Sequence, residues 1–455
     1  MTTRDRLLAV QAFSIAAVLV ISTLAGRQLF QDGVNFVVHS LQEPGWFPQP
    51  TPRRFFAVVW STGLIRLLGR LDAEAVALGS VLFGLLGFAQ IAGPATAILT
   101  ARLASPIKSV LLAAFLSGAM LIANFVVSEL LFAYALTALF VVFTLDPSRD
   151  PRAWIRFVCA ALLVASYEVV AVSNLFLALG AWLSAGSERR PGWSKAALVA
   201  LLLAGPAFQV FWYGINPQPG VGAAKDLRMY PIVAGSVALA GLLVLAFRSI
   251  GRWPLVRTLV VLAVLAAPLA LLVLPDTYRL RTELFELAYP SRFHTMCALC
   301  FIALVPALLG QTLWNGPQRL LDWIGETVLF DLAAAMTALF CGLSLLASLD
   351  AYLYRTRLDA ALSELSGVVA VRDCAFCVAP ERFGAPDLSF TWTWPLFGIA
   401  HTLHRPDAPA VVVLNDPLRD PRPTYPYERA QIDAFLRDEA VRRQAARSDG
   451  AAPQH

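Results

Sequence analysis

The chain has 455 residues, of which 58% are hydrophobic and only 15% are charged. A soluble domain of this length is closer to half apolar and one quarter charged, so a single large soluble core is excluded. The formal net charge is +5, but no basic tract alternates with aromatic residues. We therefore expect no nucleic-acid partner.

The hydrophobic residues lie in blocks of about 20, a pattern typical of membrane-spanning helices. We expect about eleven spans, and hence an all-α polytopic membrane protein. The first span follows Arg4 and Arg6 and so has the look of a signal peptide, but we interpret it as a retained helix. The expected spans are residues 7–26, 74–99, 107–123, 127–145, 154–171, 172–186, 195–214, 230–247, 257–274, 295–313 and 327–348.

The chain leaves the first span through the sequence GRQLFQDGVNFVVHS, which contains Asp32 and His39. A carboxylate at this place can act as a general base if a pocket partly desolvates it. The alternative is an acid at a helix end in water. We predict Asp32 as a catalytic base and His39 as part of an acceptor pocket.

Residues 27–72 form a long first loop. Its centre carries Arg53 and Arg54, and residues 55–70 have the pattern of an amphipathic helix lying in the membrane interface. Arginine binds phosphate oxygens through its planar, forked guanidinium group. The pair is therefore a candidate for binding a donor phosphate, and the alternative is anchoring to lipid headgroups.

Two pairs of spans are joined by tight turns, near residues 124–129 and 167–174. The turns carry Glu129, Tyr167 and Glu168. Ionisable groups at membrane depth are costly and usually face a cavity or a partner. These three residues are predicted to line an acceptor pocket; the two acids could instead couple protons in a transporter.

The distribution of arginine and lysine in the loops predicts a cytoplasmic N-terminus, and an odd number of spans then places the C-terminal region outside. The outside segment 275–295 holds Arg279, Arg281 and Arg292, against this trend. A bound anion explains them better than topology does, so we predict that they bind a donor phosphate. Internal pairing with Glu283 and Glu286 is the alternative.

After the membrane domain, expected at 1–350, we predict a small periplasmic α/β domain at 351–430 and a charged, partly disordered tail at 431–455. LDAALSEL indicates a helix, and GVVAV and AVVVL indicate strands. Cys374 and Cys377 are expected to form a local disulfide or to remain free thiols. His401 and His404 are three residues apart without obvious partners, so no metal site is expected.

Asp32 after the first span, the long first loop with its interface helix, the short hairpins and the outside C-terminal domain together resemble the GT-C glycosyltransferases. The resemblance is one of layout and covers residues 7–350. It implies that Asp32 is the base and that an arginine near residues 289–293 lies by the donor phosphate. Many members carry a second acid in the first loop, where this chain has Gly33.

The sequence thus predicts a glycosyltransferase of a bacterial inner membrane that uses a polyprenyl-phosphate-linked sugar and a lipid, glycan or protein acceptor on the periplasmic face. Membrane lipids are the other expected partners. No cofactor is firmly implied, and nothing in the sequence supports a divalent cation. A transporter or lipid flippase is the second interpretation, and a non-catalytic subunit of an envelope assembly complex is the third.

Overall fold

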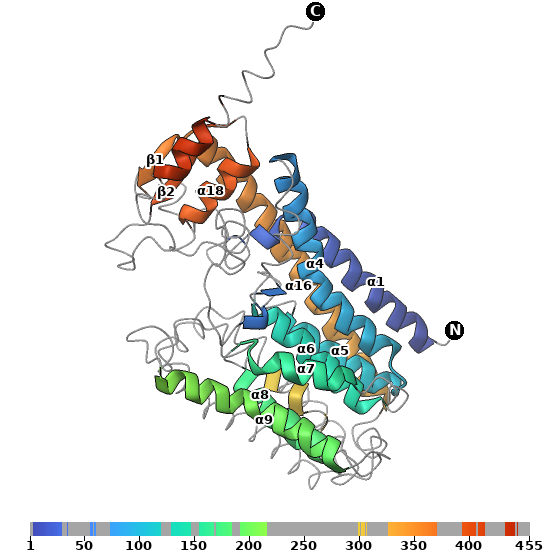
Figure 1. The fold of residues 1–455 in the computed structure, drawn as a ribbon. Helices are drawn as coiled ribbons and strands as arrows, with labels where there is room; N and C mark the ends of the chain where they lie inside the picture. The colour runs from blue at the N-terminus through green and yellow to red at the C-terminus, as the bar shows by residue number, and fades with distance from the viewer. Residues whose placement is uncertain are drawn as a thin grey trace, which may run out of the picture.

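The structure is a computed structural model of the whole chain (Figure 1). The description that follows rests on residues 3–29, 34, 55–57, 59–60, 73–119, 129–146, 154–167, 170–183, 192–215, 299–300, 302–304, 306, 326–370, 394–405, 408–414, 433–441 and 444. The predicted spans at 230–247 and 257–274, and all but a few residues of 295–313, lie outside this set.

The described part of the chain is mostly helical. The helices that match expected spans are α1 (Thr3–Leu24), α4 (Ala73–Thr100), α5 (Ser105–Ala119), α6 (Glu129–Leu145), α7 (Trp154–Val164), α8 (Val170–Leu183), α9 (Gly192–Ile215) and α16 (Glu326–Ser363). By length and composition, α4 and α9 are long and apolar enough to cross a membrane. Shorter apolar stretches lie in α1, α5, α6, α7 and α8.

The helices pack into one bundle, whose long members run roughly side by side (Figure 1). Helix α16 lies along α1 and α5, α4 contacts α1 and α6, and α6 continues the bundle to α7, α8 and α9. The N-terminus lies at one end of the bundle, and the C-terminal elements lie at the other.

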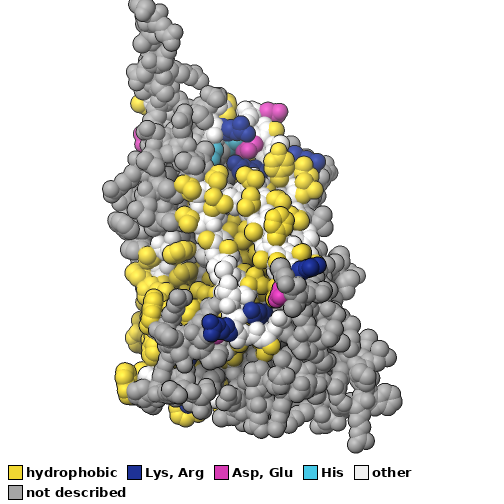
Figure 2. Space-filling view, turned by 90° about the vertical axis from the view of Figure 1, so that its right-hand side faces the viewer, with side chains coloured by type: hydrophobic (Ala, Val, Ile, Leu, Met, Phe, Trp, Pro, Cys, Tyr) yellow, Lys and Arg dark blue, Asp and Glu magenta, His cyan; other side chains and the backbone are white. Residues whose placement is uncertain are grey.

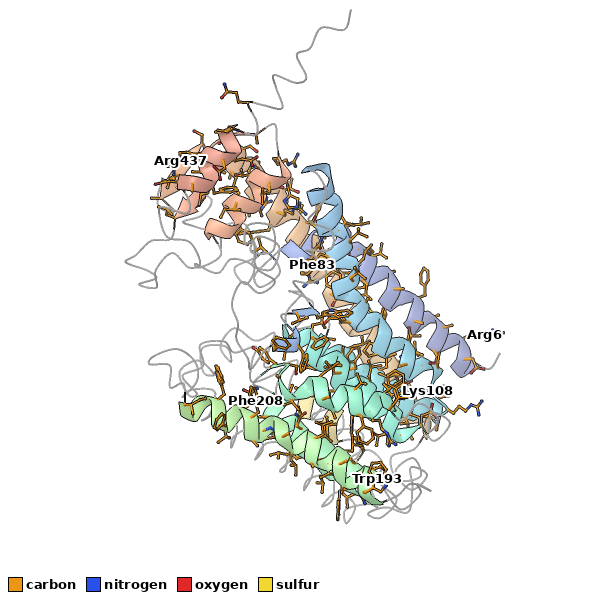
Figure 3. All side chains as sticks on the ribbon, viewed as in Figure 1. Arg6, Phe83, Lys108, Trp193, Phe208 and Arg437 are labelled. Atoms are coloured by element: carbon orange, nitrogen blue, oxygen red, sulfur yellow. The ribbon has the colours of Figure 1, made fainter. Side chains whose placement is uncertain are left out.

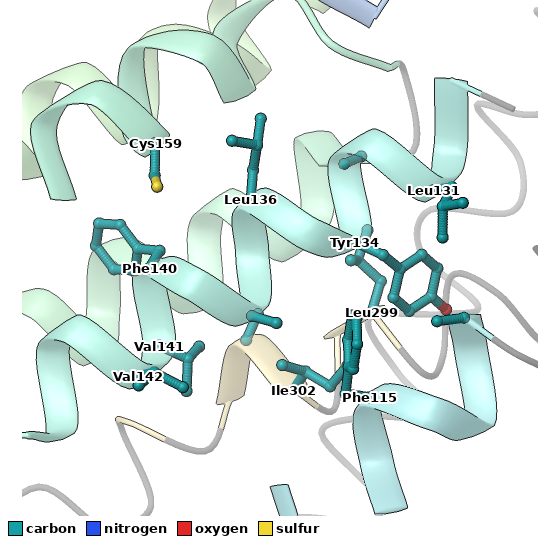
Figure 4. Close-up of a cluster of buried hydrophobic side chains, with 14 of the residues drawn as sticks. Phe115, Leu131, Tyr134, Leu136, Phe140, Val141, Val142, Cys159, Leu299 and Ile302 are labelled. Carbon is teal, nitrogen blue, oxygen red and sulfur yellow. The ribbon is translucent and has the colours of Figure 1, made fainter. Parts of the chain in front are cut away.

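A continuous hydrophobic core joins these helices. Phe115 of α5 and Tyr134 and Phe140 of α6 are fully buried in it, together with Leu299 and Ile302 from a segment distant in the sequence (Figure 4). Gly118 of α5 leaves the space that the Tyr134 ring occupies, since a Cβ atom at Gly118 would overlap that ring.

Buried hydrogen bonds join α1 to α16. Gln11 donates to the Thr337 hydroxyl at 3.2 Å, and the hydroxyls of Ser22 and Ser348 are 2.8 Å apart. Just past α1, in the short 3-10 helix η1 (Arg27–Leu29), Arg27 donates to Ser348 at 3.2 Å and to the Ser344 carbonyl at 3.3 Å. These polar pairs fix the register between two otherwise apolar helices.

Helix α16 continues without a break through residue 350, where the sequence analysis expects the membrane domain to end. The predicted span at 327–348 and the predicted helix LDAALSEL therefore belong largely to one helix. The physical reason is visible in the sequence: neither glycine nor proline occurs between Gly342 and Gly367, so nothing stops the helix at the change in polarity.

Beyond α16 the chain forms a parallel pair of strands, β1 (Gly367–Ala370) and β2 (Val411–Leu414), with Gly367 opposite Val411. Helix α18 (Trp394–His404) lies between the strands in the sequence and packs on β2. Both predicted strands are confirmed. Residues 433–441 of the charged tail are helical, and Phe435 and Leu436 pack against this unit.

Replacing Gly118 by alanine should destabilise the bundle by roughly 1–3 kcal/mol, because the new methyl group overpacks the core against Tyr134. Thermal unfolding in detergent, followed by circular dichroism, measures the effect. Gly342→Ala in α16 is the matched control, since its methyl group meets no atom within 4 Å. Equal melting temperatures for the two variants would contradict this account of the core.

Candidate functional site

The structure describes two of the sequence-predicted site residues. Glu129 begins α6, although its side chain is outside the description, and Tyr167 follows α7 with only 6% of its surface exposed. The other predicted site residues lie outside the described residues: Asp32, His39, Arg53, Arg54, Glu168, Arg279, Arg281 and Arg292. Cys374 and Cys377 also lie outside them.

The described neighbours of Asp32 on both sides are buried. Arg27 and Gln28 are 0% and 1% exposed, and Gln28 donates to the Ser80 carbonyl of α4 at 3.3 Å. Val34, two residues beyond Asp32, is fully buried in a cluster with Ala351 and Tyr354 of α16. Arg27, Gln28 and Val34, which flank Asp32 in the sequence, therefore lie in the protein interior.

The start of the predicted interface helix contacts the helical bundle. The Phe56 backbone N–H donates to the Ala165 carbonyl at 3.1 Å, in the turn between α7 and α8. Trp60 stacks on Phe132 of α6, with ring centroids 6.0 Å apart, and Ala57 is fully buried. The structure therefore brings the first loop and the second hairpin together.

The second hairpin turns slightly earlier than the sequence indicates. Helix α7 ends at Val164 and α8 begins at Val170, so the turn covers residues 165–169 and not 167–174. Ser166 donates to the Leu163 carbonyl at 3.4 Å, and the Val170 N–H donates to the Tyr167 carbonyl at 3.2 Å. These bonds satisfy polar groups in a turn whose described residues are largely buried.

A second group of polar side chains lies between α16 and α18. Asp359 of α16 pairs with Arg355 one turn earlier, at 3.7 Å, and with Arg405 just past α18, at 3.9 Å. Its Oδ1 atom lies 3.1 Å from Nδ1 of His401. His401 and His404 are three residues apart in α18, so both stand on one face of that helix.

The hydrogen bonds determine which ring nitrogen of each histidine carries the proton. His404 Nδ1 lies 2.7 Å from the Ala400 carbonyl, which can only accept, so Nδ1 is the donor. His401 Nδ1 faces the Asp359 carboxylate and donates in the same way. Both Nε2 atoms are buried, and neither has a hydrogen-bond partner in the described part of the chain.

Both histidines, Arg355 and Asp359 line a small cavity, with Leu358 and Phe397 among its apolar walls. The cavity has a volume of about 30 Å³, room for one or two water molecules. It lies beyond the part of α16 predicted to span the membrane, against the C-terminal strands and helix.

Burial and neighbouring charges determine the protonation states. Burial raises the pKa of Asp359, but the His401 hydrogen bond and the charges of Arg355 and Arg405 together hold that pKa below its ordinary value. Burial lowers the pKa of His404, and Arg355 acts in the same direction. At neutral pH the cluster therefore holds an ionised Asp359 beside a neutral His404.

Sequence reasoning identified the spacing of the two histidines but missed Asp359 and Arg355. The only local signal is the spacing of four residues between Arg355 and Asp359, which is common on solvated helices. The contact with His401 joins residues 42 positions apart, and only the packing of α18 on α16 reveals it.

Lowering the pH should loosen α18 in the ligand-free protein. For Asp359 and His404 the pKa in the folded protein lies below the pKa in the unfolded chain. Each group therefore stabilises the folded protein fully at pH values above its unfolded pKa, and this contribution is lost as the pH falls through its folded pKa. The contribution of His404 should be lost first, below about pH 6.5, and the contribution of Asp359 should be lost below about pH 4. Hydrogen exchange of the α18 amides across this range measures the loss.

His404→Gln should remove the first phase of this loss, and Asp359→Asn should remove the second. Unchanged phases in both variants would show that other groups cause the pH dependence.

Comparison of the chain with protein-family models, with curated proteins and with solved structures finds no match. The function is therefore argued from the chain's own residues. The residues that bear on it are the buried Arg27, Gln28 and Val34 on either side of Asp32, and the contact of Phe56 with Ala165.

Proposed function

We propose that the chain is an integral membrane glycosyltransferase of the GT-C type, in a bacterial inner membrane. It transfers a sugar from a polyprenyl-phosphate donor to an acceptor on the periplasmic face, with Asp32 as the general base. The N-terminus is cytoplasmic and the C-terminal unit is periplasmic.

The observation that carries this proposal is the burial of the residues around Asp32. A helix end in water would leave its flanking residues exposed, whereas Arg27, Gln28 and Val34 are buried. A carboxylate kept away from bulk water is a stronger base than a solvated one. The flanking burial therefore favours the catalytic interpretation over the solvated helix end.

Helix lengths support a site that opens to one side of the membrane. The 11 residues of α7 span about 16 Å, and the 14 residues of α8 about 21 Å. The hydrocarbon core of a bilayer is about 30 Å thick. A hairpin of this length would place its turn, which contacts Phe56 of the first loop, below the outer surface.

The surface supports a membrane position. Figure 2 shows an apolar band between charged side chains on the face that it presents. Exposed apolar residues of α1 include Phe13 and Leu24. Exposed tryptophans stand where α7 and α9 begin and α8 ends, at Trp154, Trp193 and Trp182. Tryptophan at helix ends is typical of the membrane interface.

Charged residues mark the two ends of the bundle. Arg6 and Lys108 lie towards one end of the helices, as does Trp193, and Arg437 lies near the other end (Figure 3). At the first end, Lys195 sits 4.4 Å from the centre of the Trp182 ring. This separation of the termini agrees with a cytoplasmic N-terminus and a periplasmic C-terminal unit.

In the proposed reaction, Asp32 takes the proton of an acceptor hydroxyl. The acceptor oxygen forms a bond to the anomeric carbon as the bond from that carbon to the phosphate oxygen breaks, and polyprenyl phosphate leaves. Arg53, Arg54, Arg279, Arg281 and Arg292 stabilise the negative charge on the leaving phosphate. His39, Glu129, Tyr167 and Glu168 shape the acceptor pocket.

The topology can be tested with single cysteines in a chain whose six native cysteines are replaced. Both Asp5 and Arg437 are exposed. In spheroplasts, a membrane-impermeant maleimide should label Arg437→Cys directly and label Asp5→Cys only after permeabilisation. Labelling of both positions from the same side would contradict the proposed topology.

The catalytic assignment predicts that Asp32→Asn lowers the rate of sugar transfer in membranes by about 10²–10⁴-fold, because the amide cannot accept the proton. Transfer from a radiolabelled polyprenyl-phosphate sugar to membrane acceptors measures the rate at matched expression. Asp5→Asn, an exposed acid at the other end of the bundle, is the control and should keep full activity. Full activity of Asp32→Asn would reject this base.

A further inference from the structure

We propose that His401 and His404 bind a single transition-metal ion through their Nε2 atoms, in the small cavity between α16 and α18. The ion is of the class that imidazole prefers, such as Zn²⁺, Co²⁺, Ni²⁺ or Cu²⁺. This site is separate from the proposed transferase chemistry and stands on different residues.

The first argument is the way each imidazole is held. Histidines that bind metals nearly always donate their other ring N–H to a carboxylate or a backbone carbonyl, which fixes the ring and its tautomer. His401 donates to Asp359 at 3.1 Å, and His404 donates to the Ala400 carbonyl at 2.7 Å. Both rings of the pair have this support.

The second argument is the state of the two free nitrogens. The His401 side chain is only 1% exposed, and its Nε2 is buried without a partner in the described part of the chain, as is Nε2 of His404. A buried polar atom without a partner is costly. A neutral imidazole presents a lone pair there, and a metal ion accepts both lone pairs at once.

The size of the cavity and the side chains around it limit which ligands it can hold. About 30 Å³ holds an ion with one or two waters. In the parts of the chain that the structure describes, no group of three or more His, Cys, Asp or Glu side chains forms a metal site. We propose that water completes the coordination, which predicts moderate affinity and an ion that can be removed.

Arg355 is the group that opposes a cation here, because it also lines the cavity. Its charge is partly balanced by Asp359 at 3.7 Å, and its guanidinium group lies against Gly26 at the end of α1. Gly26 has a φ of 75°, and a Cβ atom there would collide with Arg355. Replacing Arg355 therefore tests which kind of ion the cavity binds. Loss of this positive charge should strengthen the binding of a cation and weaken the binding of an anion.

The test uses the full-length protein in detergent, purified without a histidine tag and stripped with a chelator. Isothermal titration with Zn²⁺, and optical titration with Co²⁺, should find one ion per chain that wild-type protein binds at this site. His401→Gln and His404→Gln should each abolish this binding. His455→Gln, at the C-terminal residue, is the control and should bind as wild type does.

Two further variants distinguish metal binding from a merely structural role of the two histidines. Asp359→Asn should weaken Zn²⁺ binding by about 10–100-fold, because it removes the support of His401. Arg355→Met should strengthen it by about 2–10-fold, because it removes a like charge. Circular dichroism and melting curves without metal check that each variant folds.

The proposal is overturned if folded His401→Gln and His404→Gln variants keep the wild-type stoichiometry. It is also overturned if Arg355→Met weakens Zn²⁺ binding, or if inorganic phosphate binds the cavity and Zn²⁺ does not. Loss of the ion in both histidine variants, with tighter binding in Arg355→Met, supports it.

Discussion

Arg27 and Ser22 hydrogen-bond to α16 inside a largely apolar interface, and the relative position of α1 and α16 depends on these bonds. Two apolar helices can slide past each other at little cost, whereas a polar pair in an apolar environment loses its partner if the helices shift. The pairing of Ser22 with Ser348 therefore fixes where α1 ends relative to α16. The chain carrying Asp32 starts from that fixed point.

Helix α16 also connects this contact to the C-terminal unit. Helix α16 runs for 38 residues. Ser348, which bonds to Ser22 and Arg27, and Asp359, which bonds to His401, therefore belong to one rigid element. Gly26 at the end of α1 lies against Arg355, which pairs with Asp359. On the strand side, the Thr402 hydroxyl bonds to both the N–H and the carbonyl of Val411, fixing α18 on β2.

The sequence predicts the elements that depend on local pattern. The apolar blocks give α4 to within one residue at each end, and the runs of valine give both strands. The pattern fails where polarity changes without a break in the backbone: α16 continues past residue 350 because no glycine or proline interrupts it. Its continuation into Asp359 is what brings that acid to the histidines.

The contacts between distant residues could not be predicted for a different reason. The bond from Phe56 to Ala165 uses backbone atoms, which carry no residue-specific signal, and the bond from His401 to Asp359 joins a histidine to an acid that looks solvated on its own helix. Both contacts arise from packing. The sequence therefore showed the spacing of His401 and His404 but not the contact with Asp359, which emerged only from the fold.

The two proposed sites share α16 but not their chemistry, and this sharing has a physical consequence. An ion on His401 would polarise its Nδ1–H and strengthen the bond to Asp359, and so tighten α18 against the C-terminal end of α16. Ala351 and Tyr354, which hold Val34, lie on the same stretch of helix. The occupancy of the metal site would then bear on how firmly Val34 is held against α16.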